Sequence, residues 1–159
     1  MMKASCAHDG DAGGLKNGAL ANALGDAEQR CADAEERLTG PRRRVLELLL
    51  AAGGPVKAYD LIAAYGEAGE AAKPPTVYRA LEFLERLGFA HRLESLNAYV
   101  AYRRSGDQHA AAFVICDCCG ATTEFDPEVG PQVEQAAGER GYRVRAVTLE
   151  ARGLCPACQ

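Results

Sequence analysis

Four of the seven cysteines form two C-x-x-C pairs, Cys116 with Cys119 and Cys155 with Cys158. Two such pairs can bring four thiolates to the corners of a tetrahedron around Zn²⁺, because each two-residue spacer makes a tight knuckle. The 35 residues between the pairs exceed the usual zinc-ribbon gap. A strand, a helix and a strand would fill them and return the second knuckle to the first. The pattern predicts a structural zinc site.

Two other interpretations of these cysteines stay open. A C-x-x-C pair can be a redox centre, and cysteines can be small buried apolar residues. Redox pairs usually open a helix after a strand, whereas no helical pattern follows the "LCPACQ" segment. We expect Cys118 to be a spare residue in the first knuckle and no ligand, and Cys6 and Cys31 to be free thiols.

The residues before the first knuckle predict a helical domain over 15–102, after a disordered, glycine-rich tail at 1–14. Apolar residues recur there at intervals of three and four, which is typical of helices. "FAHRLES" and "NAYVAYRR" then predict two strands joined by a tight turn. Three short helices followed by a hairpin is the order of a winged helix-turn-helix. The expected helices are 15–36 with Gly25 as a candidate break, 40–52 between Thr39 and the Gly53-Gly54 pair, 57–69, and 73–88.

A hinge at 103–109 leads to a second domain, 110–159, in which the pattern changes. Short apolar runs at 111–116 and 121–125 predict strands on either side of the first knuckle. Asp126 is expected to cap a helix over 126–141, and alternating residues predict a strand over 142–155. The fold class is therefore α+β.

Composition excludes several classes of protein. The 159 residues are 48% hydrophobic and 25% charged, and the longest apolar runs are too short to cross a membrane. The first residues lack the apolar core of a secretory signal, so we expect a cytoplasmic protein with reduced cysteines. Residues 37–106 have eleven basic and seven acidic side chains. This excess weakly indicates a polyanionic partner for that segment.

Four segments carry a resemblance to a known family: "LTGPRRRVL", "KAYDLIAAY", "AKPPTVYRALEFLERLGFAHRLES" and "FVICDCCG…GLCPAC". In order and spacing they resemble the ferric uptake regulator superfamily, and in particular its zinc uptake regulator branch. The resemblance implies a homodimer with a winged-helix DNA-binding domain and an α/β dimerisation domain. It implies that the protein is not an enzyme, does not associate with a membrane and has no small organic substrate. It implies a repressor that binds operator DNA when zinc is bound and controls zinc-uptake genes.

The resemblance also implies which residues contact DNA. Arginine can bond O6 and N7 of guanine with two hydrogen bonds, and a tyrosine ring can pack on a thymine methyl group. Arginines at a helix start can bind phosphates and so position the duplex. The implied base contacts are Tyr59 and Arg79, with Thr76 and Tyr78 beside them, and the implied phosphate contacts are Arg42, Arg43 and Arg44.

A regulatory zinc site is implied at the hinge, so that each subunit would bind one structural and at least one regulatory zinc. His91, His109 and Glu124 match three of its four ligand positions, and Tyr102 occupies the fourth, where the branch has a cysteine. The fourth ligand is then Asp107, a water molecule or Tyr102. Without a thiolate we expect weaker zinc affinity or a shifted zinc threshold.

Three rival functions remain at this level. An iron- or peroxide-responsive regulator of the same superfamily is favoured by nitrogen and oxygen ligands, although the histidine-rich stretch typical of their hinge is absent. A zinc hydrolase could use His91, His109 and Glu124 to hold a reactive water, but no nucleophile or oxyanion donor is evident. A winged helix that binds protein is the third rival. It would differ from a repressor because the affinity of a repressor for DNA falls steeply as the salt concentration rises.

Overall fold

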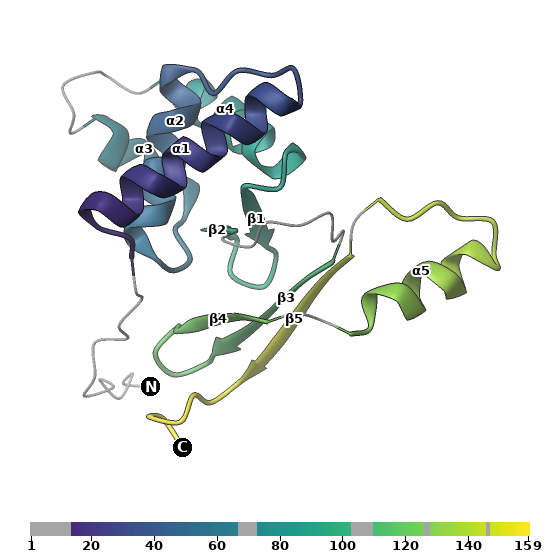
Figure 1. Ribbon diagram of the computed structural model, residues 1–159. Coiled ribbons are helices and arrows are strands. Elements are labelled where there is room, and N and C mark those ends of the chain that lie inside the picture. Colours follow the sequence, from purple (N-terminus) through teal and green to yellow (C-terminus); the bar gives the residue numbers. More distant parts are fainter. Residues whose placement is uncertain (1–13, 67–72, 103–109, 126–127, 146) are drawn as a thin grey trace. The chain divides into compact units, whose positions relative to one another are not determined.

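The computed structural model describes residues 14–66, 73–102, 110–125, 128–145 and 147–159. These residues fall into two compact units, a helical one up to residue 102 and a smaller one from residue 110 (Figure 1). Helices and an antiparallel hairpin come first, and a small sheet with one helix follows. The predicted α+β class is confirmed. No helix in the described ranges is long and apolar enough to cross a membrane.

The N-terminal unit has the predicted winged-helix order. Its elements are α1 (Asn17–Asp33), α2 (Gly40–Ala52), α3 (Ala58–Gly66), α4 (Pro74–Arg86), β1 (Ala90–Leu93) and β2 (Ala98–Ala101). The predicted break at Gly25 is wrong, because α1 passes through it without interruption. Leu24 and Ala27 on either side of it are buried in the core. Their packing outweighs the cost of about 1 kcal/mol that a glycine adds to a helix interior.

Helix α2 lies at the centre of this unit and packs against α1, α3, α4 and β2. Pro41 lies in its first turn, and Gly53 ends it with φ of +68°, donating its N–H to the carbonyl of Leu49 at 3.2 Å. Spacing by three and four predicts a buried stripe of Val45, Leu48, Leu49 and Ala52 on this helix. Val45 and Leu49 are fully buried. Leu48 is half-buried and Ala52 is exposed, whereas Leu46 and Leu50 are buried in the core. A helix with neighbours on several sides buries a broader face than a stripe.

Helix α4 buries the face that its spacing predicts. Val77, Ala80, Leu81 and Leu84 lie in the core, together with Phe83. The opposite face is exposed and carries Pro75, Arg79, Glu82 and Arg86. After α4 the β1–β2 hairpin turns at Asn97, whose φ is +47°. Val56 forms a bridge with Tyr99 of β2 through two backbone hydrogen bonds of 2.8 and 2.7 Å, which attaches the hairpin to the segment between α2 and α3.

The C-terminal unit is a three-stranded sheet in the order β4-β3-β5 with one helix. Its elements are β3 (Ala110–Cys116), β4 (Thr122–Phe125), α5 (Gly130–Gly138) and β5 (Val147–Gly153). Helix α5 starts later than predicted, after Val129, and Asp126 lies outside the described residues. Strand β5 is shorter than the predicted 142–155. Its seven residues pair one by one with residues 110–116 of β3. Because β3 begins at Ala110, which pairs with Val147, residues before Val147 have no residue of β3 to pair with.

The central strand β3 pairs antiparallel with β4 and parallel with β5 (Figure 1). In the parallel pair, Cys116 lies opposite Gly153. Parallel strands end at the same edge of a sheet, so the turns that follow β3 and β5 start side by side. Cys116 ends β3, and the other three paired cysteines lie in these two turns.

Candidate functional site

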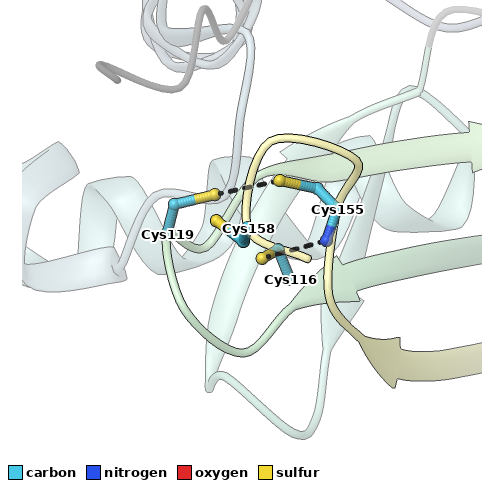
Figure 2. A group of neighbouring side chains, drawn as sticks. All are labelled: Cys116, Cys119, Cys155 and Cys158. Atoms are coloured by element: carbon cyan, nitrogen blue, oxygen red, sulfur yellow. Dashed lines mark hydrogen bonds between the residues drawn. The ribbon is translucent and has the colours of Figure 1, made fainter. Parts of the chain in front are cut away.

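The structure brings together the four cysteines of the two C-x-x-C pairs. Cys116 and Cys119 come from the end of β3 and the turn after it, and Cys155 and Cys158 from the turn after β5 (Figure 2). Their Sγ atoms all lie within 4.8 Å of one another, and no other histidine, cysteine or carboxylate in the described part of the chain belongs to this group. The predicted return of the second knuckle to the first, by β4, α5 and β5, is what the fold provides.

Backbone hydrogen bonds shape each knuckle. In the first, the N–H of Cys116 donates to the carbonyl of Ala121 at 2.8 Å, and the N–H of Gly120 donates to the carbonyl of Cys116 at 2.9 Å. Gly120 has φ of +75°, a conformation that a side chain would strain. In the second, the N–H of Cys158 donates to the carbonyl of Cys155 at 2.8 Å. Each knuckle therefore brings its two sulfurs close together.

A second set of contacts joins the first knuckle to β5. The N–H of Asp117 donates to the carbonyl of Gly153 at 2.8 Å, which extends the ladder by one bond. The carboxylate of Asp117 pairs with Arg152 at 2.6 Å. Both side chains are about half exposed, so the ion pair adds little stability to the contact between the two turns.

The sulfur atoms have unequal electrostatic surroundings. Hydrogen bonds from the backbone N–H groups of Cys119 and Cys155 lower the pKa of Cys116 to about 6, and the N–H of Cys155 lies 3.3 Å from its Sγ. Burial, and then the neighbouring sulfurs, raise the pKa of Cys158. Four such thiols cannot all ionise side by side unless a cation compensates their charge, so binding of a dication would release protons.

The geometry fits zinc. A tetrahedron with Zn–S bonds of about 2.3 Å has sulfur–sulfur edges of about 3.8 Å. The Sγ atoms of Cys119 and Cys155 are 3.8 Å apart (Figure 2). The redox interpretation fits less well, because neither pair opens a helix. Cys118 lies outside the group, Cys31 is a free thiol in the core of the N-terminal unit, and Cys6 lies outside the described residues.

The residues expected to contact bases lie on the surface of the N-terminal unit. Tyr59 in the first turn of α3 is 79% exposed, and Tyr78 on α4 is 51% exposed. Arg79 is exposed beside Tyr78, and Thr76 is half-buried in the first turn of α4. Their exposure leaves these side chains accessible to a partner.

The three consecutive arginines of α2 differ in their contacts. Arg43 forms an ion pair with Glu28 of α1, and Arg44 pairs with Glu47 at 2.9 Å. The guanidinium of Arg42 instead lies 3.5 Å from the centre of the Phe83 ring. Each arginine therefore has a partner within the protein, but only Arg42 is stacked on a ring among the three.

The expected ligands of the regulatory site belong to different units. His91 on β1 is half-buried, and burial lowers its pKa, so the imidazole stays neutral and able to bind a metal near pH 7. The Tyr102 ring meets it edge-on at 4.7 Å between centroids. Glu124 on β4 lies opposite Phe113 of β3, and its Oε1 is buried. His109 and Asp107 lie outside the described residues.

A sequence profile described as the ferric uptake regulator family matches residues 33–152. The chain belongs to the ferric uptake regulator family. The resemblance seen in the sequence is thus confirmed. Within this family, the chain is 44% identical to the zinc uptake regulation protein of Escherichia coli (strain K12), over 85% of this chain and 80% of that protein. It is 32% identical to the ferric uptake regulation protein of Neisseria meningitidis serogroup A, over 80% of this chain and 89% of that protein.

Solved structures of the ferric uptake regulator family show the same fold. A zinc uptake regulator complexed with zinc and DNA has a TM-score of 0.82 and 42% sequence identity, covering 90% of this chain and 96% of that chain. The crystal structure of holo XcZur has a TM-score of 0.75 and 43% identity, covering 85% and 95%.

Proposed function

We propose that this protein is a zinc-responsive transcriptional repressor that binds operator DNA as a homodimer when zinc is bound, and that it controls zinc-uptake genes in the cytoplasm. The observation that carries this proposal is the identity of 44% with a zinc uptake regulator over 85% of the chain, against 32% with a ferric one. The exposed tyrosines and arginine of α3 and α4 supply a surface suited to bases. An enzymatic role is not proposed.

Two kinds of zinc site have different tasks in this proposal. The cysteine group would hold a structural zinc that cross-links β3 and β5, because four thiolates close its coordination shell. The regulatory zinc would bind His91, His109 and Glu124, with Tyr102, Asp107 or water as the fourth ligand. Because these ligands come from the winged helix, the hinge and the sheet, one ion would restrict the domains to a DNA-binding orientation.

DNA recognition would then depend on zinc by linkage. Tyr59 and Arg79 would read bases, with Thr76 and Tyr78 beside them, and Arg43 and Arg44 would exchange their carboxylate partners for phosphates. If zinc strengthens DNA binding by some factor, DNA strengthens zinc binding by the same factor. The dimer would present two copies of α4 at the spacing of two half-sites.

The proposal is tested by fluorescence anisotropy of a labelled promoter fragment of a zinc-uptake gene in zinc buffers, with metal content measured on the same samples. We expect DNA affinity to rise as occupancy climbs from about one towards two zinc ions per chain, because the structural site fills first. Binding that ignores zinc but follows iron or manganese would identify an iron- or peroxide-responsive regulator instead.

Tyr102→Cys tests the regulatory site. A thiolate is a softer and stronger zinc ligand than a phenol or water, so we expect the zinc midpoint of DNA binding to fall to about one-tenth of its original value. The measurement is the same anisotropy titration. Tyr102→Phe is the matched control, since it keeps the ring against His91 but removes the oxygen. An unchanged midpoint in Tyr102→Cys would place the fourth ligand elsewhere.

A further inference from the structure

Phe83 of α4 is the centre of a cluster that includes two arginines and a glutamate. The guanidinium of Arg42 lies 3.5 Å from the centre of its ring and that of Arg86 lies 5.3 Å from it. Glu36 accepts a hydrogen bond from Arg86 at 2.7 Å and forms a longer ion pair with Arg42 at 3.9 Å. Arg42 also donates to the carbonyl of Arg37 at 2.7 Å. Every charged group of the cluster thus has a partner of opposite charge or an aromatic face.

The cluster joins three elements of the N-terminal unit. Glu36 and Arg37 belong to the segment between α1 and α2, Arg42 to the first turn of α2, and Phe83 and Arg86 to the last turn of α4. Phe83 is 3% exposed, and the side chain of Arg42 is 30% exposed. A partly desolvated guanidinium on an aromatic face is more strongly bound than one in water.

Phe83 lies four residues after Arg79 on α4, which is about one helical turn. A helix of this length moves as a rigid body, so a rotation of α4 at Phe83 also displaces Arg79. A contact that fixes Phe83 therefore fixes where Arg79 meets a base edge.

We propose that Arg42 is a positioning residue that sets the orientation of α4 through Phe83, and that it is not one of the phosphate contacts expected from the sequence. This role rests on the proposed function, since it requires α4 to read DNA. Within the described residues Arg43 and Arg44 form ion pairs and no aromatic contact, and they stay the expected phosphate contacts at this helix start.

The two roles differ in salt dependence. A phosphate contact releases counterions, so its loss reduces the slope of log K against log salt by about 1. A positioning residue leaves that slope unchanged and lowers the preference for the operator over unrelated DNA. Lysine can replace arginine at a phosphate, but it cannot stack a planar group on Phe83 while also donating a hydrogen bond to the carbonyl of Arg37 and pairing with Glu36.

The experiment compares zinc-loaded wild type, Arg42→Ala, Arg42→Lys, Phe83→Leu and the double variant Arg42→Ala/Phe83→Leu. Each is titrated at several salt concentrations with the promoter fragment and with a scrambled duplex of equal length. Arg43→Ala is the reference for a phosphate contact. Thermal unfolding and dimer mass are recorded for every variant. If Arg42→Ala does not fold, Arg42→Lys still tests the proposal.

We expect Arg42→Ala and Arg42→Lys to lower operator affinity about tenfold each, with scrambled-duplex affinity and salt slope unchanged. We expect the double variant to lose no more than either single one, because both remove the same contact. A salt slope reduced by about 1 in Arg42→Ala, with recovery in Arg42→Lys, would overturn the positioning role alone. A wild type that does not distinguish the two duplexes would overturn the proposed function, and this role with it.

Discussion

Cys119→Ser is expected to abolish cooperative folding of the C-terminal unit and to remove about one zinc ion per chain. A serine hydroxyl is a poor zinc ligand, and the remaining three thiols would be crowded without a compensating cation. For small zinc domains the metal supplies about 10–16 kcal/mol, which is the folding free energy itself. Metal analysis, near-ultraviolet circular dichroism and thermal unfolding of the purified variant measure this effect.

Cys118→Ser is the matched control, because it makes the same substitution in the same turn but outside the group of four. Under reducing conditions it should keep its zinc and its unfolding temperature within a few degrees of wild type. The winged-helix unit should remain folded in both variants, since its core of leucine, valine and alanine side chains contains none of these residues. Full zinc retention by Cys119→Ser would refute the assignment of the sulfur cluster as a metal site.

Arg79→Ala is expected to weaken specific DNA binding by ten- to a hundredfold while leaving the dimer folded. A bidentate contact with guanine contributes about 1–3 kcal/mol of discrimination. Arg79 is exposed on α4, so its removal creates no cavity. Anisotropy on the promoter fragment and on duplexes substituted at single positions would locate the base at which specificity relaxes.

Arg140→Ala provides a comparison for Arg79→Ala. Arg140 is also exposed and basic but lies just after α5 in the other unit, where it donates to the carbonyl of Ala136. The two variants change the net charge by the same amount, so a purely non-specific electrostatic effect would be equal in both. If both variants lost the same DNA affinity, or if Arg79→Ala unfolded at a lower temperature than wild type, a contact of Arg79 with a base would be contradicted.

The location of the cysteine group could be predicted because it depends on short spacing and on the order of elements. A C-x-x-C pair makes a knuckle locally, and a strand–helix–strand connection favours parallel pairing that returns Cys155 to Cys116. The buried face of α4 could also be predicted, since Val77 to Leu84 follow the helical period. The knuckles and the buried face depend on residues a few positions apart, and the return of Cys155 to Cys116 follows from the order of the elements between them.

Features that depend on individual packing contacts between residues far apart in the sequence could not be predicted. The stack of Arg42 on Phe83 joins residues 41 positions apart, and neither residue type marks it in the sequence. Gly25 suggested a break because propensity was considered without the packing of Leu24 and Ala27. The length of β5 is set by its partner β3 and could not be found from its own alternating pattern. Tertiary contacts decide all three.

The parallel pairing of β3 with β5 also determines how quickly the sulfur cluster could exchange a metal ion. The two knuckles meet only while β5 is docked, which presents the second pair of sulfurs to the first at a high effective concentration. Release of the ion would therefore require the sheet to open, as in local unfolding. A zinc ion in the cluster would therefore exchange slowly, and rapid changes in cellular zinc would be sensed by the proposed hinge ligands.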